Sequence, residues 1–345
     1  MIRVLVVDDS PVASQMLSYI LSSDTSINVI GIATDGEDAI RMVARLKPDI
    51  VTMDINMPVM NGFEATRKIM ETTPVPIVIV SSSYDPKEVT KSFCAIEVGA
   101  LTIIAKPVGI RHPLYETQSR NLINTVKAMS EVKVVTRRGM IEPAVSAKPE
   151  IAPAFQEIKV IAIGASTGGP PVLQTILSGL PKDIPVPVMI VQHITQGFTS
   201  GFASWLSDVT GVQVRMPENG ENSEPGKVYI APDSVHMVVD SGGHILLNND
   251  PPDNGLRPSV AHLFRSVANV YRDKAAGVLL TGMGKDGAHE LKMMRDAGAV
   301  TFAQDQASSV VFGMPGEAVN IGAAKYVLSP EAISGSLVQL MRKRQ

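Results

Sequence analysis

Short apolar runs alternate with helical stretches along most of the chain, and the alternation occurs in two series. In the first 110 residues the strand-like runs are RVLVVDD, NVIGIA, DIVTMD, PIVIVSS and LTIIAKP. The intervening segment PVASQMLSYILSS is predicted to be a helix with Val12, Met16 and Ile20 on one face. Strands separated by helices form parallel sheets covered on both faces. The sequence therefore predicts an amino-terminal (βα)5 unit with a parallel sheet.

The second series begins with IKVIAIGAS and continues with VPVMIVQH, GVLLTGM and AVTFAQD. One segment, KVYIAPDSVHMVVDSGGHILLNN, breaks the alternation because three short strand-like runs are separated only by turns. It predicts antiparallel hairpins joined to an otherwise parallel, doubly wound α/β sheet, with the last turn at Ser241-Gly242-Gly243. Charges and prolines without periodicity fill residues 128–157. We therefore expect domains at 1–127 and 158–345, joined by a linker.

Charge and cysteine usage narrow the class of protein. The chain has 31 basic and 34 acidic residues, a net charge of −3, which offers no electrostatic footprint for nucleic acid. The single cysteine, Cys94, excludes an intrachain disulfide and fits a reducing compartment. Neither a signal peptide nor an apolar run of membrane-spanning length is present in the sequence. We expect a cytoplasmic protein that binds no nucleic acid and does not insert into a membrane.

Polar residues follow four of the strand-like runs in the first series. Asp8 and Asp9 end the first run, Asp54 the third, Ser81 the fourth and Lys106 the fifth. The carboxyl ends of parallel strands converge on one crevice, so three carboxylates would repel one another there unless a divalent cation bound. Oxygen ligands of this kind suit Mg²⁺, and Asp54 beside a lysine and a hydroxyl could accept a phosphoryl group. Taken singly, each residue could equally be a loop cap or a solvated side chain.

The decapeptide IAIGASTGGP at 161–170 places a serine in a glycine-rich turn between a predicted strand and a predicted helix. A dinucleotide-binding turn needs a glycine where Ser166 stands, and the next strand ends in His193 rather than an acidic residue. A P-loop needs a lysine, which the turn lacks. Gly164-x-Ser166-x-Gly168 instead has the spacing of a nucleophile elbow.

A serine nucleophile requires a base and a group that orients the base. His193 ends the next predicted strand, and Asp286 follows GVLLTGMGK, so both could reach the crevice at Ser166. The chain order Ser…His…Asp differs from that of ordinary α/β-hydrolases. His236, in the hairpin segment, is the second choice for the base. Ser166 or Asp286 could alternatively cap a helix.

These motifs resemble two known families. VVDDS, MDINMPVMNG, VSSS and AKP are similar to the receiver domain of two-component response regulators. GASTGGP, VQHITQGF, VYIAPDSVHM, RPSVAHLFRSVA and LLTGMGKDGA resemble the chemotaxis protein-glutamate methylesterase family, which carries such a receiver in front. Departures from the family pattern are Ile103, where receivers often have an aromatic switch residue, and His262, where relatives often have aspartate in an RPSVD stretch.

The resemblance implies a role for each matching position. Asp8, Asp9, Asp54 and the backbone carbonyl of Asn56 would hold Mg²⁺, while Ser81 and Lys106 would contact a phosphoryl group on Asp54. Ser166, His193 and Asp286 would form the catalytic triad, and the backbone N–H of Met283 would help bind the oxyanion. Esterase chemistry of this type needs no cofactor.

The resemblance also implies a regulated hydrolase. It would demethylate glutamate methyl esters, and deamidate glutamines, on chemoreceptors, with a histidine kinase as phosphodonor. The receiver would cover the active site until Asp54 is phosphorylated. A phosphorylation-controlled binding protein without chemistry remains the alternative, whereas no basic helix-turn-helix supports a DNA-binding output.

Overall fold

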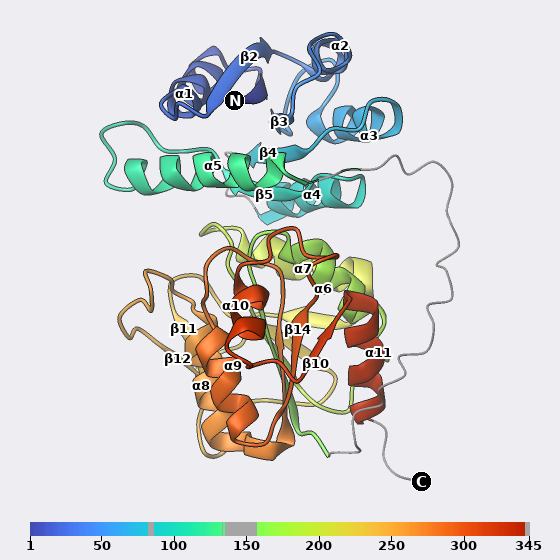
Figure 1. Cartoon of the computed structure of the whole chain (residues 1–345), viewed down its shortest axis with the longest axis vertical. Helices are drawn as coiled ribbons and strands as arrows, with labels where there is room; N and C mark the ends of the chain where they lie inside the picture. Colours follow the sequence, from blue (N-terminus) through green and yellow to red (C-terminus); the bar gives the residue numbers. More distant parts are fainter. Residues whose placement is uncertain (82–85, 133, 135–156, 342–345) are drawn as a thin grey trace. The chain divides into compact units, whose positions relative to one another are not determined.

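The two series of apolar runs form two separate parallel sheets. The computed structural model describes residues 1–81, 86–132, 134 and 157–341 (Figure 1). Spatial contacts divide the chain into an amino-terminal unit, Met1–Ala144, and a carboxy-terminal unit, Val145–Gln345. The predicted linker falls largely outside the described residues, although helix α5 continues to Ser130, inside the segment predicted as linker.

The amino-terminal unit is the predicted (βα)5 sheet. Its strands lie in the order β2-β1-β3-β4-β5, and every pair is parallel. Because the order reverses at β1, the loops after β1 and β3 diverge and leave a crevice at the carboxyl ends of these strands. The strands are β1 (Ile2–Val7), β2 (Ile27–Ala33), β3 (Ile50–Met53), β4 (Ile77–Ser81) and β5 (Thr102–Ala105), and the helices are α1 (Pro11–Ser22), α2 (Gly36–Leu46), α3 (Gly62–Thr72), α4 (Pro86–Glu97) and α5 (Tyr115–Ser130).

Helix α1 is present as predicted, and Val12 lies outside its buried face. Its buried residues are Ser14, Leu17, Ile20 and Leu21, whereas Val12 is 78% exposed. Of the three residues predicted to share a helical face, Val12, Met16 and Ile20, only Ile20 is therefore buried. Ser14 can occupy an inward position because its hydroxyl donates to Pro11 O at 3.2 Å, which satisfies the polar group inside the helix.

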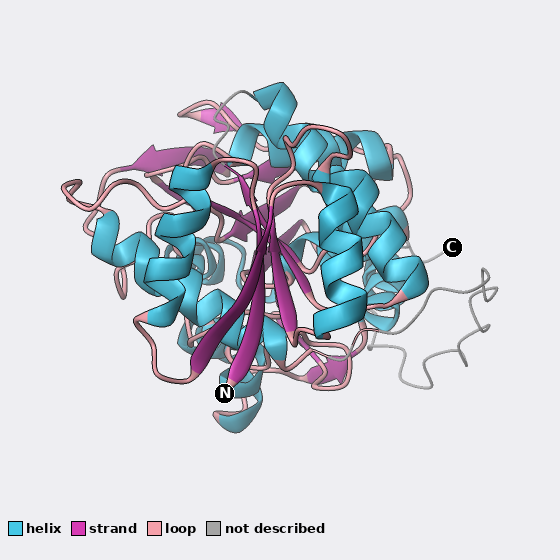
Figure 2. Ribbon diagram, turned by 90° about the horizontal axis from the view of Figure 1, so that it is seen from above, coloured by secondary structure: helices cyan, strands magenta, loops and turns pink. Residues whose placement is uncertain are grey.

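The carboxy-terminal unit contains a seven-stranded sheet in the order β15-β14-β13-β6-β7-β10-β8, with every pair parallel. Its strands follow the same parallel plan as those of the amino-terminal unit, where helices lie on both sides of the strands (Figure 2). The chain leaves β6 toward β7 and returns to its other side at β13, so the switch point is at β6. The strands are β6 (Val160–Ala165), β7 (Val188–Gln192), β8 (Gln213–Arg215), β10 (Lys227–Ile230), β13 (Ala275–Leu279), β14 (Val300–Gln304) and β15 (Tyr326–Leu328). The helices are α6 (Gly169–Ser178), α7 (Thr199–Thr210), α8 (Val260–Tyr271), α9 (Ala288–Asp296), α10 (Met314–Asn320) and α11 (Pro330–Met341).

The predicted hairpin is present but belongs to a second, smaller sheet. Strands β11 (His236–Val239) and β12 (His244–Asn248) pair antiparallel across the Ser241-Gly242-Gly243 turn, and β9 (Glu221–Asn222) pairs with β12. The first of the three strand-like runs is β10, which instead joins the parallel sheet between β7 and β8. The accessory sheet, defined as β9, β11 and β12, packs on α8, where Val239 N donates to Ser266 Oγ at 3.1 Å.

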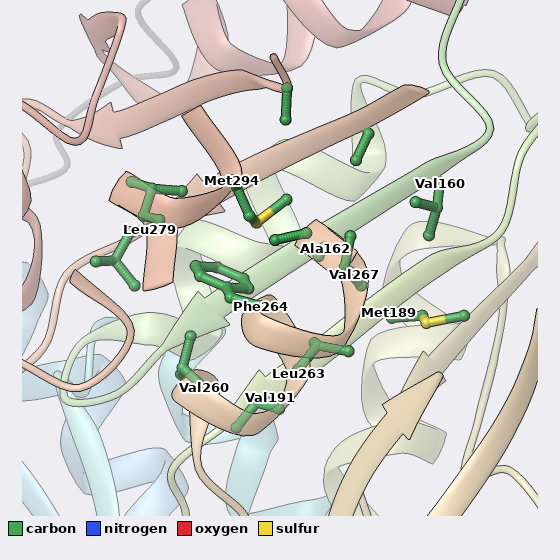
Figure 3. Close-up of a cluster of buried hydrophobic side chains, with 14 of the residues drawn as sticks. Val160, Ala162, Met189, Val191, Val260, Leu263, Phe264, Val267, Leu279 and Met294 are labelled. Atoms are coloured by element: carbon green, nitrogen blue, oxygen red, sulfur yellow. The ribbon is translucent and has the colours of Figure 1, made fainter. Parts of the chain in front are cut away.

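The main core of this unit lies between α8 and α9 and the central strands. Leu263, Phe264 and Val267 of α8 meet Ala162 of β6 and Leu279 of β13 (Figure 3). Each fully buried side chain of this size contributes about 1.5–3 kcal/mol relative to exposure. The core therefore fixes α8 against the strands whose carboxyl ends carry the predicted site. Among the described residues, no helix has the length and apolar character needed to cross a membrane.

Candidate active site

Ser166 lies in the predicted strand–turn–helix, immediately after β6. Its backbone N–H donates to Thr281 O at 3.0 Å, and its carbonyl accepts from Gly169 N at 2.8 Å. Gly168 precedes α6 with φ +79°, a left-handed conformation that a residue with a side chain adopts only with strain. The turn thus holds Ser166 between the ends of β6 and β13 and the start of α6.

His193 follows β7 at the same edge of the sheet. Ala165 of β6 is in register with Gln192 of β7, and His193 N donates to Ala165 O at 2.9 Å. Ser166 and His193 are each the residue after this pair, so the sheet register places them side by side. The predicted convergence of these two strand ends is present.

Asp286 approaches His193 from the loop after β13. His193 Nε2 and Asp286 Oδ2 are 2.9 Å apart, and both side chains are largely buried. The distance is that of an ion pair, but the ring nitrogen has no aligned hydrogen-bond partner among the described residues. Attraction between a carboxylate and an imidazolium depends on distance more than on alignment, so the contact can still stabilise a protonated ring.

The start of α8 holds the Asp286 carboxylate. Val260 N donates to Asp286 Oδ2 at 2.7 Å, and Ala261 N donates to Asp286 Oδ1 at 3.2 Å. Ser259 is the N-cap of α8, and its hydroxyl accepts from His262 N. The free N–H groups at a helix start favour a negative charge, so α8 both positions the carboxylate and stabilises its anion.

The loop after β13 also brings Met283 close to the nucleophile turn. A Cβ added at Gly282 would lie 2.7 Å from Ser166 Cβ, which shows how closely this loop passes. Gly282 N donates to Val311 O at 3.0 Å, which holds the loop in place. Met283 follows directly and is 42% exposed as a residue. Its backbone is therefore near Ser166, as an oxyanion donor requires.

His236, the second choice for the base, is engaged elsewhere. It is fully buried, its Nδ1 accepts from Ser259 N at 3.2 Å, and its Nε2 lies 3.3 Å from Pro251 O. Burial, with the neighbouring His262 ring, lowers the pKa of His236, so the imidazole stays neutral. Both nitrogens contact the backbone, which leaves neither one for Ser166. His193 is the better base.

The amino-terminal unit gathers its predicted polar residues at the β1–β3 switch point. Lys106 Nζ lies 2.8 Å from Asp8 Oδ2 and 2.9 Å from Asp54 Oδ2, and Asp8 and Asp54 are buried. The contact with Asp54 is an aligned hydrogen bond, whereas that with Asp8 meets only the distance of an ion pair. Asp9 is exposed, yet Asp8, Asp9 and Asp54 each offer an oxygen within 4.8 Å of the others. Three carboxylates facing one lysine leave an excess of negative charge.

Burial and neighbouring charges have opposing effects on the pKa values of Asp54 and Lys106. Burial raises the pKa of the Asp54 carboxyl, and the Lys106 ammonium opposes this shift only in part. Burial alone would lower the pKa of Lys106, but the nearby carboxylates of Asp8 and Asp54 outweigh it and raise the pKa. Ser81 ends β4 beside β5, with Lys106 N donating to Ser81 O at 2.8 Å. Asn56 is exposed in the loop after β3.

Comparison with known proteins assigns both units. The CheB methylesterase family profile matches residues 161–337, and the response regulator receiver domain profile matches residues 4–114. A relative from Syntrophus aciditrophicus, named protein-glutamate methylesterase/protein-glutamine glutaminase 1, is 52% identical over 99% of this chain and 98% of its own. The chain belongs to the CheB methylesterase family.

Other relatives match either the whole chain or its carboxy-terminal unit. A Nitrosospira multiformis protein named protein-glutamate methylesterase/protein-glutamine glutaminase is 51% identical over the whole of this chain and 98% of its own. The crystal structure of the Thermotoga maritima CheB methylesterase catalytic domain is 37% identical, covers 53% of this chain and 99% of its own, and superposes with a TM-score of 0.52. The receiver and the methylesterase fold predicted from the sequence are both confirmed.

Two departures from the CheB pattern can now be placed. Ile103 is buried in β5, in register with Ile79 of β4, so an aliphatic side chain occupies the switch position. His262 stacks on His236, with ring centroids 3.7 Å apart. Counted from Arg257, the aspartate of an RPSVD stretch falls on Ala261, so the departure assigned to His262 lies one residue earlier.

Sequence reasoning missed the groups that hold the CheB site together. It did not identify the N–H donors of Val260 and Ala261 or the side chain of Gln192, whose Nε2 donates to backbone carbonyls beside the site. Ser259 after a proline is a recognisable helix start and could have predicted the N–H donors of Val260 and Ala261. No local pattern predicts the position of the Gln192 side chain, because it depends on the pairing of β6 with β7.

Proposed function

We propose that this chain is a phosphorylation-controlled protein-glutamate methylesterase, with glutamine deamidation as a second reaction at the same site. The observation that carries the proposal is the 2.9 Å contact of His193 with Asp286 beside the Ser166 turn. Membership of the CheB methylesterase family supports the same activity. The substrates are chemoreceptors whose methylated glutamates are hydrolysed during adaptation.

Ser166 Oγ is the nucleophile in this mechanism. Nε2 of His193 faces Asp286, which leaves Nδ1 to take the proton as Oγ attacks the γ-carbonyl carbon of the ester. Asp286 stabilises the imidazolium that forms. The protonated His193 then donates to the leaving oxygen and methanol departs. Water, activated by the same ring, hydrolyses the acyl-enzyme to free glutamate and regenerates the Ser166 hydroxyl.

The backbone N–H of Met283 binds the oxyanion of the tetrahedral intermediate. Removing one such donor typically lowers turnover by about 10²–10³-fold, so this contact is a large part of the rate. The close passage of Gly282 against Ser166 supports the assignment. A methyl ester offers little surface for binding, and specificity therefore depends on docking of the receptor helices.

Asp54 is the phosphorylation site that controls the enzyme. The carboxylates of Asp8, Asp9 and Asp54 with the Asn56 carbonyl would hold Mg²⁺, an oxygen donor set that suits this ion. When bound, Mg²⁺ neutralises charge on the entering phosphoryl group, while Lys106 and Ser81 contact its oxygens. A histidine kinase is the phosphodonor.

The segments act as input and output of a cytoplasmic switch. Residues 1–127 are the receiver, 128–157 the linker and 158–345 the enzyme. The receiver covers the active site until phosphorylation of Asp54 shifts the population toward an open arrangement. A single cysteine fits a reducing compartment such as the cytoplasm.

Methanol release from methylated chemoreceptor, measured with and without a small phosphodonor, tests the proposal. Ser166→Ala should abolish release, and a fluorophosphonate probe should label the wild type at Ser166 but not this variant. Asp54→Asn should retain basal release and lose stimulation. Release that survives Ser166→Ala would refute the nucleophile, and stimulation that survives Asp54→Asn would move the switch elsewhere.

A further inference from the structure

Gln192 is the last residue of β7, and its side chain is buried beside the nucleophile turn. Only 4% of the residue is exposed. Its Nε2 lies 2.8 Å from Ser166 O and 2.8 Å from His193 O. Both partners are carbonyl oxygens, which only accept, so the atom that faces them must be the NH₂ group. One amide thus binds the backbone of the nucleophile and the backbone of the base.

The opposite end of the amide has no such partner. Gln192 Oε1 is buried without a hydrogen bond among the described residues. It lies against Gly169, where an added Cβ would be 2.0 Å from Oε1. Leaving a buried carbonyl oxygen unpaired is costly, so the NH₂ contacts must outweigh that cost for the side chain to stay in this orientation.

We propose that Gln192 is a positioning residue for the hydrolase reaction: its amide sets the separation of Ser166 and His193 by binding both backbones. We name this arrangement the amide clamp; the inference rests on the proposed function, because it assigns Ser166 and His193 their roles. Gln192 itself touches no reacting atom. The register of β6 with β7 ends at Ala165 and Gln192, and His193 N still donates to Ala165 O. The clamp adds a link from β7 to Ser166, one residue further along the turn.

The clamp predicts a loss of rate without a loss of substrate binding. A displacement of about 1 Å between catalytic groups can lower a rate about 10²-fold. Gln192→Met keeps the volume and removes the two donors. Gln192→Glu keeps the shape and places a carboxylate against two carbonyls. Both variants should lower kcat for methanol release by about 10²-fold with KM unchanged, because neither changes the docking surface.

The control is Thr301→Val, which also removes two buried backbone contacts. Thr301 Oγ1 donates to Ala323 O at 2.8 Å and accepts from Lys325 N at 3.0 Å, near the amino end of β14 and away from Ser166. It should lower the melting temperature in the same way as Gln192→Met and leave the rate of fluorophosphonate labelling near that of the wild type. A purely structural role for Gln192 predicts the same result for both variants.

Two readouts separate positioning from stability. A buried carboxyl gains its proton above its ordinary pKa, and the protonated side chain of the Gln192→Glu variant regains one donor. The ratio of the Gln192→Glu labelling rate to that of the wild type should therefore rise as the pH falls from about 8 to about 5. Gly169→Ala pushes its methyl group against Oε1, so it should slow labelling strongly in the wild type and much less in a Gln192→Ala background.

The outcomes decide the proposal. Slow labelling of folded Gln192 variants, a pH-dependent ratio and non-additivity with Gly169→Ala support the amide clamp. Labelling of folded Gln192→Met within threefold of the wild type, or additive effects with Gly169→Ala, would overturn it. If Gln192→Met does not fold, Gly169→Ala and the pH series decide alone. A wild type that labels at Ser166 but releases no methanol refutes the proposed substrate, and the labelling rates still decide on the clamp.

Discussion

Replacing Asp286 with asparagine tests how the charge beside His193 contributes to turnover. Two unit charges at the observed 2.9 Å attract by ~6 kcal/mol at an effective dielectric constant of about 20. At about 1.4 kcal/mol per tenfold change in rate, this attraction corresponds to roughly 10⁴-fold in turnover. The positive charge on His193 forms only when the ring takes the Ser166 proton. Its attraction to the Asp286 carboxylate therefore stabilises the transition state and not the ground state.

Asparagine also cannot reproduce the hydrogen bonds of the carboxylate. Val260 N and Ala261 N donate to different oxygens of Asp286. An amide has one oxygen, so either orientation leaves an N–H facing the NH₂ group. One unpaired buried donor costs about 1–3 kcal/mol of the free energy of unfolding. The variant should therefore remain folded but less stable.

The assay is methanol release together with the rate of fluorophosphonate labelling, both measured below the melting temperature of the variant. Asp305→Asn is the control for loss of a carboxylate charge alone, in the loop after β14. Its Oδ1 accepts both hydrogen bonds, from Ser308 N at 2.8 Å and Ser308 Oγ at 2.7 Å, so an asparagine oxygen can retain them. This control should keep turnover near that of the wild type. An Asp286→Asn enzyme within tenfold of the wild type would refute the electrostatic reasoning.

Two further predictions concern other charged groups. Lys106→Met leaves Asp8 and Asp54 without their shared cation. The free energy of unfolding at neutral pH, measured by denaturant titration, should therefore fall in EDTA and recover in Mg²⁺. Equal losses in EDTA and in Mg²⁺ would count against a metal at this cluster. His236 is neutral when folded because burial lowers its pKa, whereas the unfolded residue has the ordinary value of about 6.5. The unfolded state therefore binds more protons, and stability is lost as the pH falls below about 6.5, by at most about 1.4 kcal/mol per pH unit for one group. His236→Gln should flatten this dependence, and an unchanged slope would contradict the assignment.

Sequence reasoning succeeded where a residue's place follows from strand order. Ser166, His193 and the loop bearing Asp286 were predicted to meet because the carboxyl ends of parallel strands share one edge. The same rule predicted Asp8, Asp54 and Lys106. Burial of both faces of the strands leaves a strong apolar signal, so the architecture of both units was also predictable.

The errors arose where tertiary contacts decide between equivalent patterns. Val12 fits a helical face with Met16 and Ile20, yet Val12 is exposed. Ser14 is buried in its place, and its polarity concealed this position in the sequence. The run KVYI reads like its hairpin neighbours, but it pairs in parallel with Val188–Ile190 of β7. Gln192 carries no sequence signal for its role, since its partners are backbone atoms from two different loops.

The position of α8 has a consequence for how the enzyme could diverge among relatives. This helix lies between the central strands and the accessory sheet, and its first two amides hold Asp286. A substitution in the hairpin, at Met237 or Val239 for example, would tilt the start of α8. The carboxylate of Asp286, which faces His193, would move with it. Adaptation rates could thus be adjusted in evolution by residues that never contact a receptor, a phosphoryl group or the ester.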